Sequence, residues 1–345
     1  MERSVMPNAL PEYREKVSLE TTFRAKYRVF AAFLICLALL LAAFALTAVL
    51  AKGKGILPLE EPPKSDAPLP PDVGTLPDAP IEPEPVPEGA TAILTRDLSV
   101  LSLGSTYICN ETPYRPDIPM LLTRVWERHM PSDEPLVLIL HTHTSEGYQP
   151  EGTSYLTGSV GDVTYTNDPT QSVIAVGETL CRVLNENGIG AIHCRDRHDS
   201  PAIGGAYERS AETVKRYLEQ YPSIEYVIDL HRDAIMSDGA LIRSAVEENG
   251  ESVAQIMAVV GTDANGTEFD HWEDNLALAL ALRERLNAGG TGVCRPVSLR
   301  NASFYQELAP HALLLEIGSS GCSPKEAERA AQRVGDALVD LILGD

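Results

Sequence analysis

The stretch LVLILHTHTSEGY, residues 136–148, constrains the fold of this chain more than any other. It begins with five apolar residues, mostly branched, and the apolar run stops abruptly at His141. A short, continuous apolar run of this kind is typical of a strand that is buried on both faces. Two later runs end in the same way, because VIDL stops at His231 and ALLL stops at Glu316. We therefore expect these strands to lie side by side and to deliver polar side chains to one edge of a sheet.

Residues 92–345 alternate between strand-like and helix-like runs. Short apolar runs predict strands over 106–109, 136–140, 191–194, 226–230, 255–261 and 312–315. Helical spacing of apolar residues predicts helices over 118–129, 170–187, 206–220, 274–287 and 323–343. This alternation favours an α/β fold with a mostly parallel sheet and helices on both faces. The active site of such a sheet lies at the carboxyl ends of its strands.

The chain begins with a polar segment, residues 1–28, followed by an apolar run without charges, Val29–Ala51. A run of this length can cross a bilayer as a helix. The basic cluster in 24–28 places residues 1–28 in the cytoplasm and the rest of the chain outside. We expect an uncleaved single-pass anchor; the alternative is a signal peptide cleaved near Ala51. Residues 52–91 are rich in Pro and Glu and predict a semi-rigid linker ahead of the folded domain.

The net charge of −21 argues against a nucleic-acid partner, because binding to phosphates needs clustered lysines and arginines. The six cysteines are irregularly spaced and form no CxxC pair, so we expect small buried side chains rather than a cysteine zinc site.

The polar residues at the predicted strand ends are of the types that bind zinc. A hydrolytic zinc site uses about three protein ligands, commonly imidazoles and a carboxylate, and leaves one position open. His141 and His143 should share one side of an extended strand, since alternate residues do. Either can join His231 from the second strand end, and Glu146 is close enough to His143 to turn back as a carboxylate ligand. Glu316 at the third strand end is then available to move a proton.

Arg232 and Asp233 directly follow His231. We expect them either to orient the ligands or to bind a carboxylate of the substrate.

Several motifs together carry a resemblance to a known family. They are NET with Tyr114, HTHTSEGY from His141, AVGETL at 175–180, IDLHRDA around His231, the VVGTD block at 259–263, and LLLEIGSSG around Glu316. In these motifs residues 92–345 resemble the stage II sporulation protein P family of endospore-forming bacteria. The N-terminal anchor and Pro-rich linker are also similar to that family.

The resemblance implies an amidase-like fold and the activity of a zinc-dependent N-acetylmuramoyl-L-alanine amidase. The expected substrate is peptidoglycan, cleaved at the amide between the muramic lactyl group and L-alanine. By the same resemblance, His143 fits the first zinc histidine better than His141, whose role stays open. His231 takes the place of the second zinc histidine, and Glu316 that of the catalytic glutamate. The third zinc ligand is Glu146 or, as the alternative, Asp168.

The resemblance also implies a cellular setting, engulfment of the forespore. The folded domain is expected on the outer face of the mother cell's septal membrane, and stage II sporulation protein D and other engulfment proteins are the expected partners. Cutting of the glycan strand, with Glu316 as general acid, is a further activity that the family suggests. The alternative from a different class is a catalytically degenerate scaffold that binds the cell wall.

Overall fold

The computed structural model describes residues 86–99 and 107–344. Backbone contacts divide the chain into Met1–Ala79 and Pro80–Asp345, and the described residues all belong to the second unit. The expected anchor at 29–51 therefore lies outside the described residues. Within 86–99 and 107–344, no helix combines the length and apolarity that a bilayer crossing requires.

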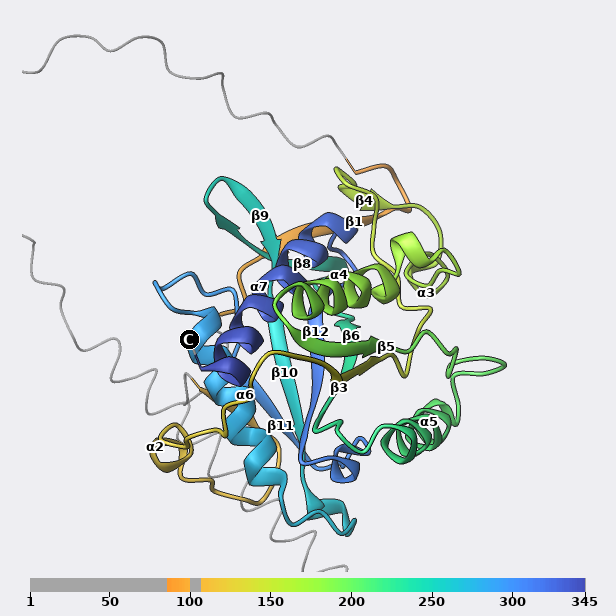
Figure 1. Ribbon diagram of the computed structural model, residues 1–345. Helices are drawn as coiled ribbons and strands as arrows, with labels where there is room; N and C mark the ends of the chain where they lie inside the picture. The colour runs from red at the N-terminus through yellow and green to blue at the C-terminus, as the bar shows by residue number, and fades with distance from the viewer. Residues whose placement is uncertain (1–85, 100–106, 345) are drawn as a thin grey trace, which may run out of the picture. The chain divides into compact units, whose positions relative to one another are not determined.

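A seven-stranded sheet forms the centre of the folded unit (Figure 1). Its order is β2 (Ile108–Asn110), β11 (Val297–Arg300), β10 (Ile256–Gly261), β12 (His311–Ser319), β6 (Tyr226–Asp233), β3 (Ser132–Leu140) and β5 (Ile189–His193). Neighbouring strands run parallel, except that β10 is antiparallel to β12. The three strands with polar ends, β3, β6 and β12, are adjacent, as the sequence predicts.

A second, five-stranded sheet was not expected from the sequence. It contains β4 (Tyr155–Leu156), β1 (Thr91–Arg96), β8 (Ala240–Glu248) and β7 (Met236–Ser237), with β9 (Glu251–Ala254) paired to β8. Only β1 and β8 run parallel in this sheet. The prediction of a mostly parallel sheet is therefore wrong, and the sheets are mixed. The reversal at β10 arises because the chain leaves β6 through β7, β8 and β9, without the helical crossover that parallel strands require.

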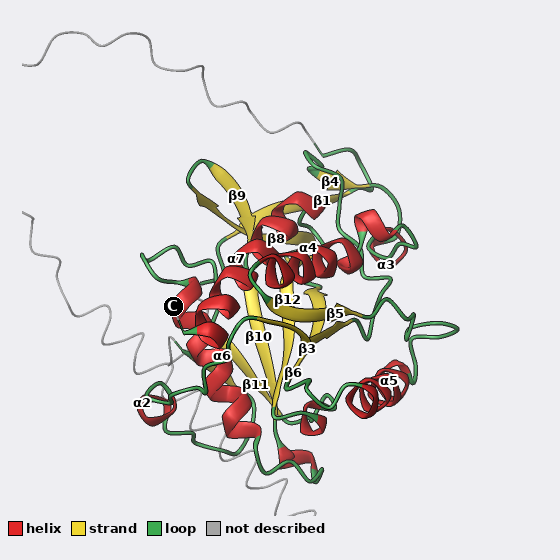
Figure 2. Ribbon diagram, in the orientation of Figure 1, coloured by secondary structure: helices red, strands yellow, loops and turns green. Residues whose placement is uncertain are grey.

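Helices cover both faces of the large sheet, as predicted (Figure 2). One face packs against α4 (Val173–Glu186), α6 (Trp272–Leu286) and α7 (Pro324–Leu343), and the other against α5 (Ala206–Gln220). The side chains of β3 alternate between the two faces. Val137 and Ile139 pack in the core under α4, α6 and α7, while Leu138 and Leu140 pack in the core under α5. We call the second side of the sheet the α5 face.

The structure confirms the bounds predicted for α5 and the start of α7. Ser323 caps α7 in a capping box with Glu326, and Pro324 occupies the first turn. The helix predicted over 118–129 is wrong, because α2 (Ile118–Leu121) ends after a single turn. The chain beyond it is extended, and Trp126 packs its ring edge-on against His311. The long connection predicted over 146–169 holds the short helix α3 (Val160–Val163) as well as β4.

Candidate metal centre

Strand register brings the predicted site residues to one edge of the sheet. Glu316 on β12 is the direct neighbour of His231 on β6. On the other side of β6, Asp229 pairs with Leu140, the last residue of β3. Since Leu140 and Val227 pack in the core under α5, alternation also turns Asp229, His231 and Glu316 toward the α5 face.

His231 is the centre of the cluster. Its Nδ1 lies 3.3 Å from Glu146 Oε2, and its Nε2 lies 2.9 Å from Asp229 Oδ2. Both carboxylates thus lie within ion-pair distance of the His231 ring. The ring of His143 stands edge-on to that of His231, with the centroids 5.4 Å apart. Thus His143, Glu146 and His231, three of the predicted ligands, converge.

Buried carboxylates surround His231 and set its charge. Burial alone lowers the pKa of His231, but the carboxylates of Asp229 and Glu146 hold it well above its ordinary value. Without a metal ion, a proton on His231 therefore balances the negative charge of these two groups. Burial lowers the pKa of His143, which favours the neutral imidazole that a metal needs.

Glu316 is half-buried, and its Oε2, which is shielded from solvent, has no hydrogen-bond partner. Burial raises its pKa to about 8, and although the charge of His231 opposes this rise, the nearby Glu146 carboxylate reinforces it. Glu316 therefore changes protonation near neutral pH, which suits a group that accepts a proton and returns it.

His141 lies apart from this cluster. Its Nδ1 bonds to the Leu230 carbonyl at 2.8 Å, and its Nε2 lies 2.8 Å from His193 Nε2. Both nitrogens are thus engaged, and burial lowers the pKa of His141 to about 3. The expectation that His141 and His143 share one side is wrong, because β3 ends at Leu140 and the chain then turns.

The loop that carries Glu146 is anchored by buried polar groups. Arg232 donates from Nε to the Gly147 carbonyl at 3.1 Å and from Nη2 to the Thr164 carbonyl at 2.7 Å. The backbone N–H of Arg232 also donates to Glu146 Oε2 at 3.1 Å. Because its guanidinium is buried and bonded to this loop, Arg232 orients a candidate ligand rather than facing a substrate.

Asp199 supports the loop from a second side. Its carboxylate accepts hydrogen bonds from Thr144 Oγ1 at 2.7 Å and from the Ser145 backbone at 2.8 Å.

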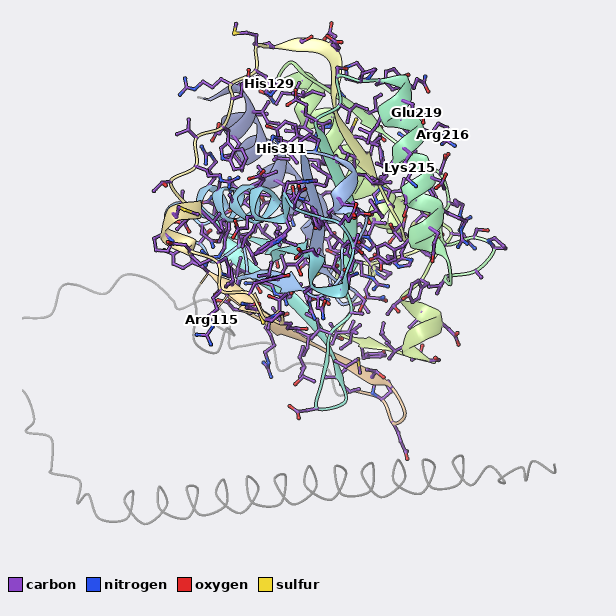
Figure 3. All side chains as sticks on the ribbon, turned by 90° about the horizontal axis from the view of Figure 1, so that it is seen from below. Arg115, His129, Lys215, Arg216, Glu219 and His311 are labelled. Atoms are coloured by element: carbon purple, nitrogen blue, oxygen red, sulfur yellow. The ribbon has the colours of Figure 1, made fainter. Side chains whose placement is uncertain are left out.

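The remaining predicted residues occupy separate places. Asp168 caps a short 3-10 helix, η1 (Pro169–Gln171), by accepting from the Thr170 backbone, and it has no contact with the cluster. Asp233 forms an ion pair with Arg295 at 2.9 Å. Two other histidines, His129 and His311 (both labelled in Figure 3), pack their rings against Tyr226, the first residue of β6.

Two donors at the centre, on His231 and Glu146, have the spacing that a zinc ion requires. Two ligand atoms each about 2.1 Å from a tetrahedral ion are roughly 3.4 Å apart. The separation of 3.3 Å between His231 Nδ1 and Glu146 Oε2 matches that value. The Asp229 carboxylate beside the opposite nitrogen is placed as in carboxylate–histidine–zinc arrangements. Glu146, and not Asp168, lies beside His231.

Among the described residues, the ligand atoms of Cys194, Asp196 and His198 lie within 4.8 Å of one another, a spacing that His143, Glu146 and His231 do not meet as a trio. The donors of the cysteine-containing group are already committed. Both ring nitrogens of His198 have hydrogen-bond partners, and Asp196 is paired with Arg216. Burial also raises the pKa of the Cys194 thiol, which disfavours the thiolate that binds metals. The chemistry of the donors favours the centre at His231.

Tyr207 on α5 was not predicted as a site residue. Its ring lies nearly parallel to that of His231 at 6.4 Å between centroids and edge-on to that of His143 at 5.7 Å. Burial raises the pKa of Tyr207 above its ordinary value, so that the hydroxyl remains a hydrogen-bond donor. No sequence signal marked this residue, because α5 is far from the histidines along the chain.

A cavity of about 350 Å³ opens beside Glu316 and Tyr207, which both line it. Asp233 and Arg295 lie in its wall. A substrate that occupies this cavity therefore contacts the carboxylate of the candidate centre.

Comparison with protein families shows which family the chain belongs to. The family described as stage II sporulation protein P matches residues 104–339 of the 345. The chain belongs to the stage II sporulation protein P family. The stage II sporulation protein P of Bacillus subtilis (strain 168) is 26% identical over 220 residues, covering 61% of this chain and 51% of that protein. The chain thus spans about half the length of this curated relative.

Solved structures of N-acetylmuramoyl-L-alanine amidases show a partial likeness to this family member. The apo amidase of Mycobacterium abscessus is 16% identical, with a TM-score of 0.38, covering 60% of this chain and 99% of its own. An amidase of Nostoc punctiforme is 15% identical, with a TM-score of 0.36, covering 62% of this chain and 97% of its own.

Proposed function

We propose that this chain is a zinc-dependent peptidoglycan hydrolase that cleaves the amide between the muramic lactyl group and the first L-alanine of the stem peptide. One observation carries the proposal: His143, Glu146 and His231 converge beside Glu316, whose buried carboxylate has no partner. Membership of the stage II sporulation protein P family supports a role in sporulation.

The zinc site would consist of His143, Glu146 and His231. A zinc ion in such a site supplies Lewis acidity toward the amide carbonyl and toward water. The Asp229 carboxylate lies beside Nε2 of His231 and orients the ring. The backbone N–H of Arg232 donates to Glu146 and positions its carboxylate. These contacts fix the donors before any ion arrives, which lowers the cost of organising the site.

Glu316 would carry the proton during the reaction. In its ionised form the carboxylate takes a proton from the attacking water, and it then gives that proton to the leaving amine of L-alanine. The burial that raises its pKa to about 8 makes both transfers feasible near neutral pH. Tyr207 also lines the cavity, and its hydroxyl can donate to an oxygen of the substrate.

The setting in the cell belongs to the same proposal. An uncleaved helix at 29–51 would anchor the chain, and the linker at 52–91 would hold the domain outside the membrane, within reach of the wall. Stage II sporulation protein D and other engulfment proteins are the partners that we propose.

The test uses the full chain in detergent, loaded with zinc and incubated with purified peptidoglycan. We expect mass spectrometry to detect released stem peptides that begin with L-alanine, and no release by the Glu316→Gln variant. Normal binding to peptidoglycan without any release of peptides by the wild-type chain would overturn the amidase, and if no new sugar ends appear either, it would favour a scaffold that binds the wall.

Glycan cleavage is a second candidate, and the raised pKa of Glu316 favours it. A protonated carboxylic acid near neutral pH is what protonation of a glycosidic oxygen requires. The same mass spectra separate the two reactions, because cleaved glycan strands yield new sugar ends while the peptides stay attached.

A further inference from the structure

The cavity beside Glu316 has a floor of side chains in strand register. Leu314 on β12 pairs with Val259 on β10, Val259 with Ser298 on β11, and Ser298 with Cys109 on β2. All four side chains line the cavity. The cavity therefore runs across four strands, from β12, which carries Glu316, to the outer strand β2.

Two arginines stand along this floor. Arg295 Nη1 donates to Asp233 at 2.9 Å, and its side chain is only 14% exposed. Its Nε and Nη2 have no acceptor among the residues that the structure describes. Arg300 donates from Nε to Ser298 at 2.7 Å and forms an ion pair with Glu111. Each arginine thus forms an ion pair with one acidic side chain and also lines the cavity.

The free Nε and Nη2 donors of Arg295 at the cavity wall can bind an anion. A carboxylate fits the planar fork of arginine with two parallel hydrogen bonds, and such charge-assisted bonds are among the strongest available. A neutral sugar has no pair of anionic oxygens to offer. The wall therefore favours an acidic peptide over a glycan strand.

We propose that this cavity binds the peptide part of the substrate, and that Arg295 grips a carboxylate on that peptide. This inference rests on the proposed function. It adds that the cavity binds the peptide side of the amide that is cleaved. Arg300, at the outer end, makes the weaker contact because its side chain is 39% exposed.

The ion pair with Asp233 brings the Arg295 guanidinium toward β6, the strand that also carries His231. The gripped carboxylate therefore lies on the side of the cavity next to the candidate centre.

The test measures binding without requiring turnover. The full chain with Glu316→Gln is titrated calorimetrically with a synthetic muramyl tripeptide carrying free carboxylates, and with the same compound fully amidated. We expect amidation to weaken binding about 10- to 100-fold, as the loss of charge-assisted hydrogen bonds does. In Arg295→Gln the acidic compound should bind as weakly as the amidated one, so that amidation has no further effect.

Two further variants control for folding and for charge. Arg295→Gln combined with Asp233→Asn removes both members of the ion pair and should show the same loss of discrimination. Arg216→Gln removes an arginine that is also paired with one acid, on the outer side of α5 (Figure 3), and should leave binding unchanged. Equal binding of the acidic and amidated compounds by the Glu316→Gln chain with Arg295 intact would overturn the subsite. If peptides bind in this way but are never released by the wild type, only the proposed reaction fails.

Discussion

Glu316 and His231 are direct neighbours on the paired parallel strands β12 and β6. Their backbone register fixes the separation between the proton carrier and the central imidazole of the candidate centre. Because this separation depends on the sheet and not on a loop, substitutions at either residue should change chemistry more than position.

Substituting Glu316→Gln should lower the rate of amide cleavage by about 10²- to 10⁴-fold, the usual contribution of general acid–base catalysis. Zinc binding should persist, since the amide replaces a carboxylate that has no hydrogen-bond partner at Oε2. The measurement is the release of stem peptides beside the zinc content of each preparation. Glu219→Gln, on the outer side of α5 (Figure 3), serves as the control and should cleave at the wild-type rate.

The third ligand can be settled with two alanine substitutions. Glu146→Ala should weaken zinc binding by more than about 100-fold, since losing even an outer-sphere partner costs 10- to 100-fold. Asp168→Ala should bind zinc normally and lose only a cap of η1. Competition with a chromophoric chelator measures both affinities. The reverse ranking would assign Asp168 as the ligand.

Gly177→Ala should destabilise the fold beneath the centre. A Cβ at this position in α4 meets His193 Nε2 at 2.6 Å and His141 Nε2 at 2.8 Å. Overpacking of this kind costs about 1–3 kcal/mol, which denaturant unfolding can measure. Gly161→Ala in α3 is the control, because the nearest atom there is 3.8 Å away and the helix should gain slightly. Equal stability of Gly177→Ala and wild type would show that the two histidines move apart freely.

Asp199 should contribute stability that depends on pH. Burial raises the pKa of its carboxyl, but hydrogen bonds from Ser145 and Thr144 outweigh burial and hold the pKa below the ordinary value of 3.8. A folded pKa below the unfolded one means that the contribution is present above the unfolded pKa and is lost as the pH falls through the folded pKa. Asp199→Asn should therefore destabilise by about 1–3 kcal/mol at pH 7. The difference from wild type should shrink toward pH 3.

Unfolding curves at the two pH values test this expectation. Asp270→Asn is the control, because this side chain is fully exposed and should change stability little at either pH. A difference for Asp199→Asn that stays constant with pH would contradict the assignment.

Local pattern was enough to predict the elements that organise the site. Capping residues and apolar spacing predicted α5 and α7. The polar residues His231 and Glu316 marked the adjacent strands β6 and β12, although both strands continue past these residues. The small sheet escaped prediction because its strands are short or partly exposed and lack a continuous apolar run. The predicted helix over 118–129 failed because tertiary contacts, such as that of Trp126 with His311, replace its second turn.

Only part of the site could be predicted from the sequence, for a related reason. Side-chain alternation holds within a strand, and His143 lies beyond the end of β3, where only the fold decides its direction. Tyr207 and Arg295 reach the cleft from elements that no local pattern connects to the histidines. Their places depend on sheet order and helix packing, which a single sequence does not display.

The anchoring of the Glu146 loop by Arg232 has a consequence for how the protein matures. Glu146 and Arg232 are 86 positions apart in the chain, and His231 immediately precedes the arginine. One docking event between β6 and this loop thus delivers two candidate metal donors together, and contacts so distant in sequence form late in folding. Under the proposed function, a newly made chain would remain catalytically silent until its core has closed, which would protect its surroundings from a half-assembled hydrolase.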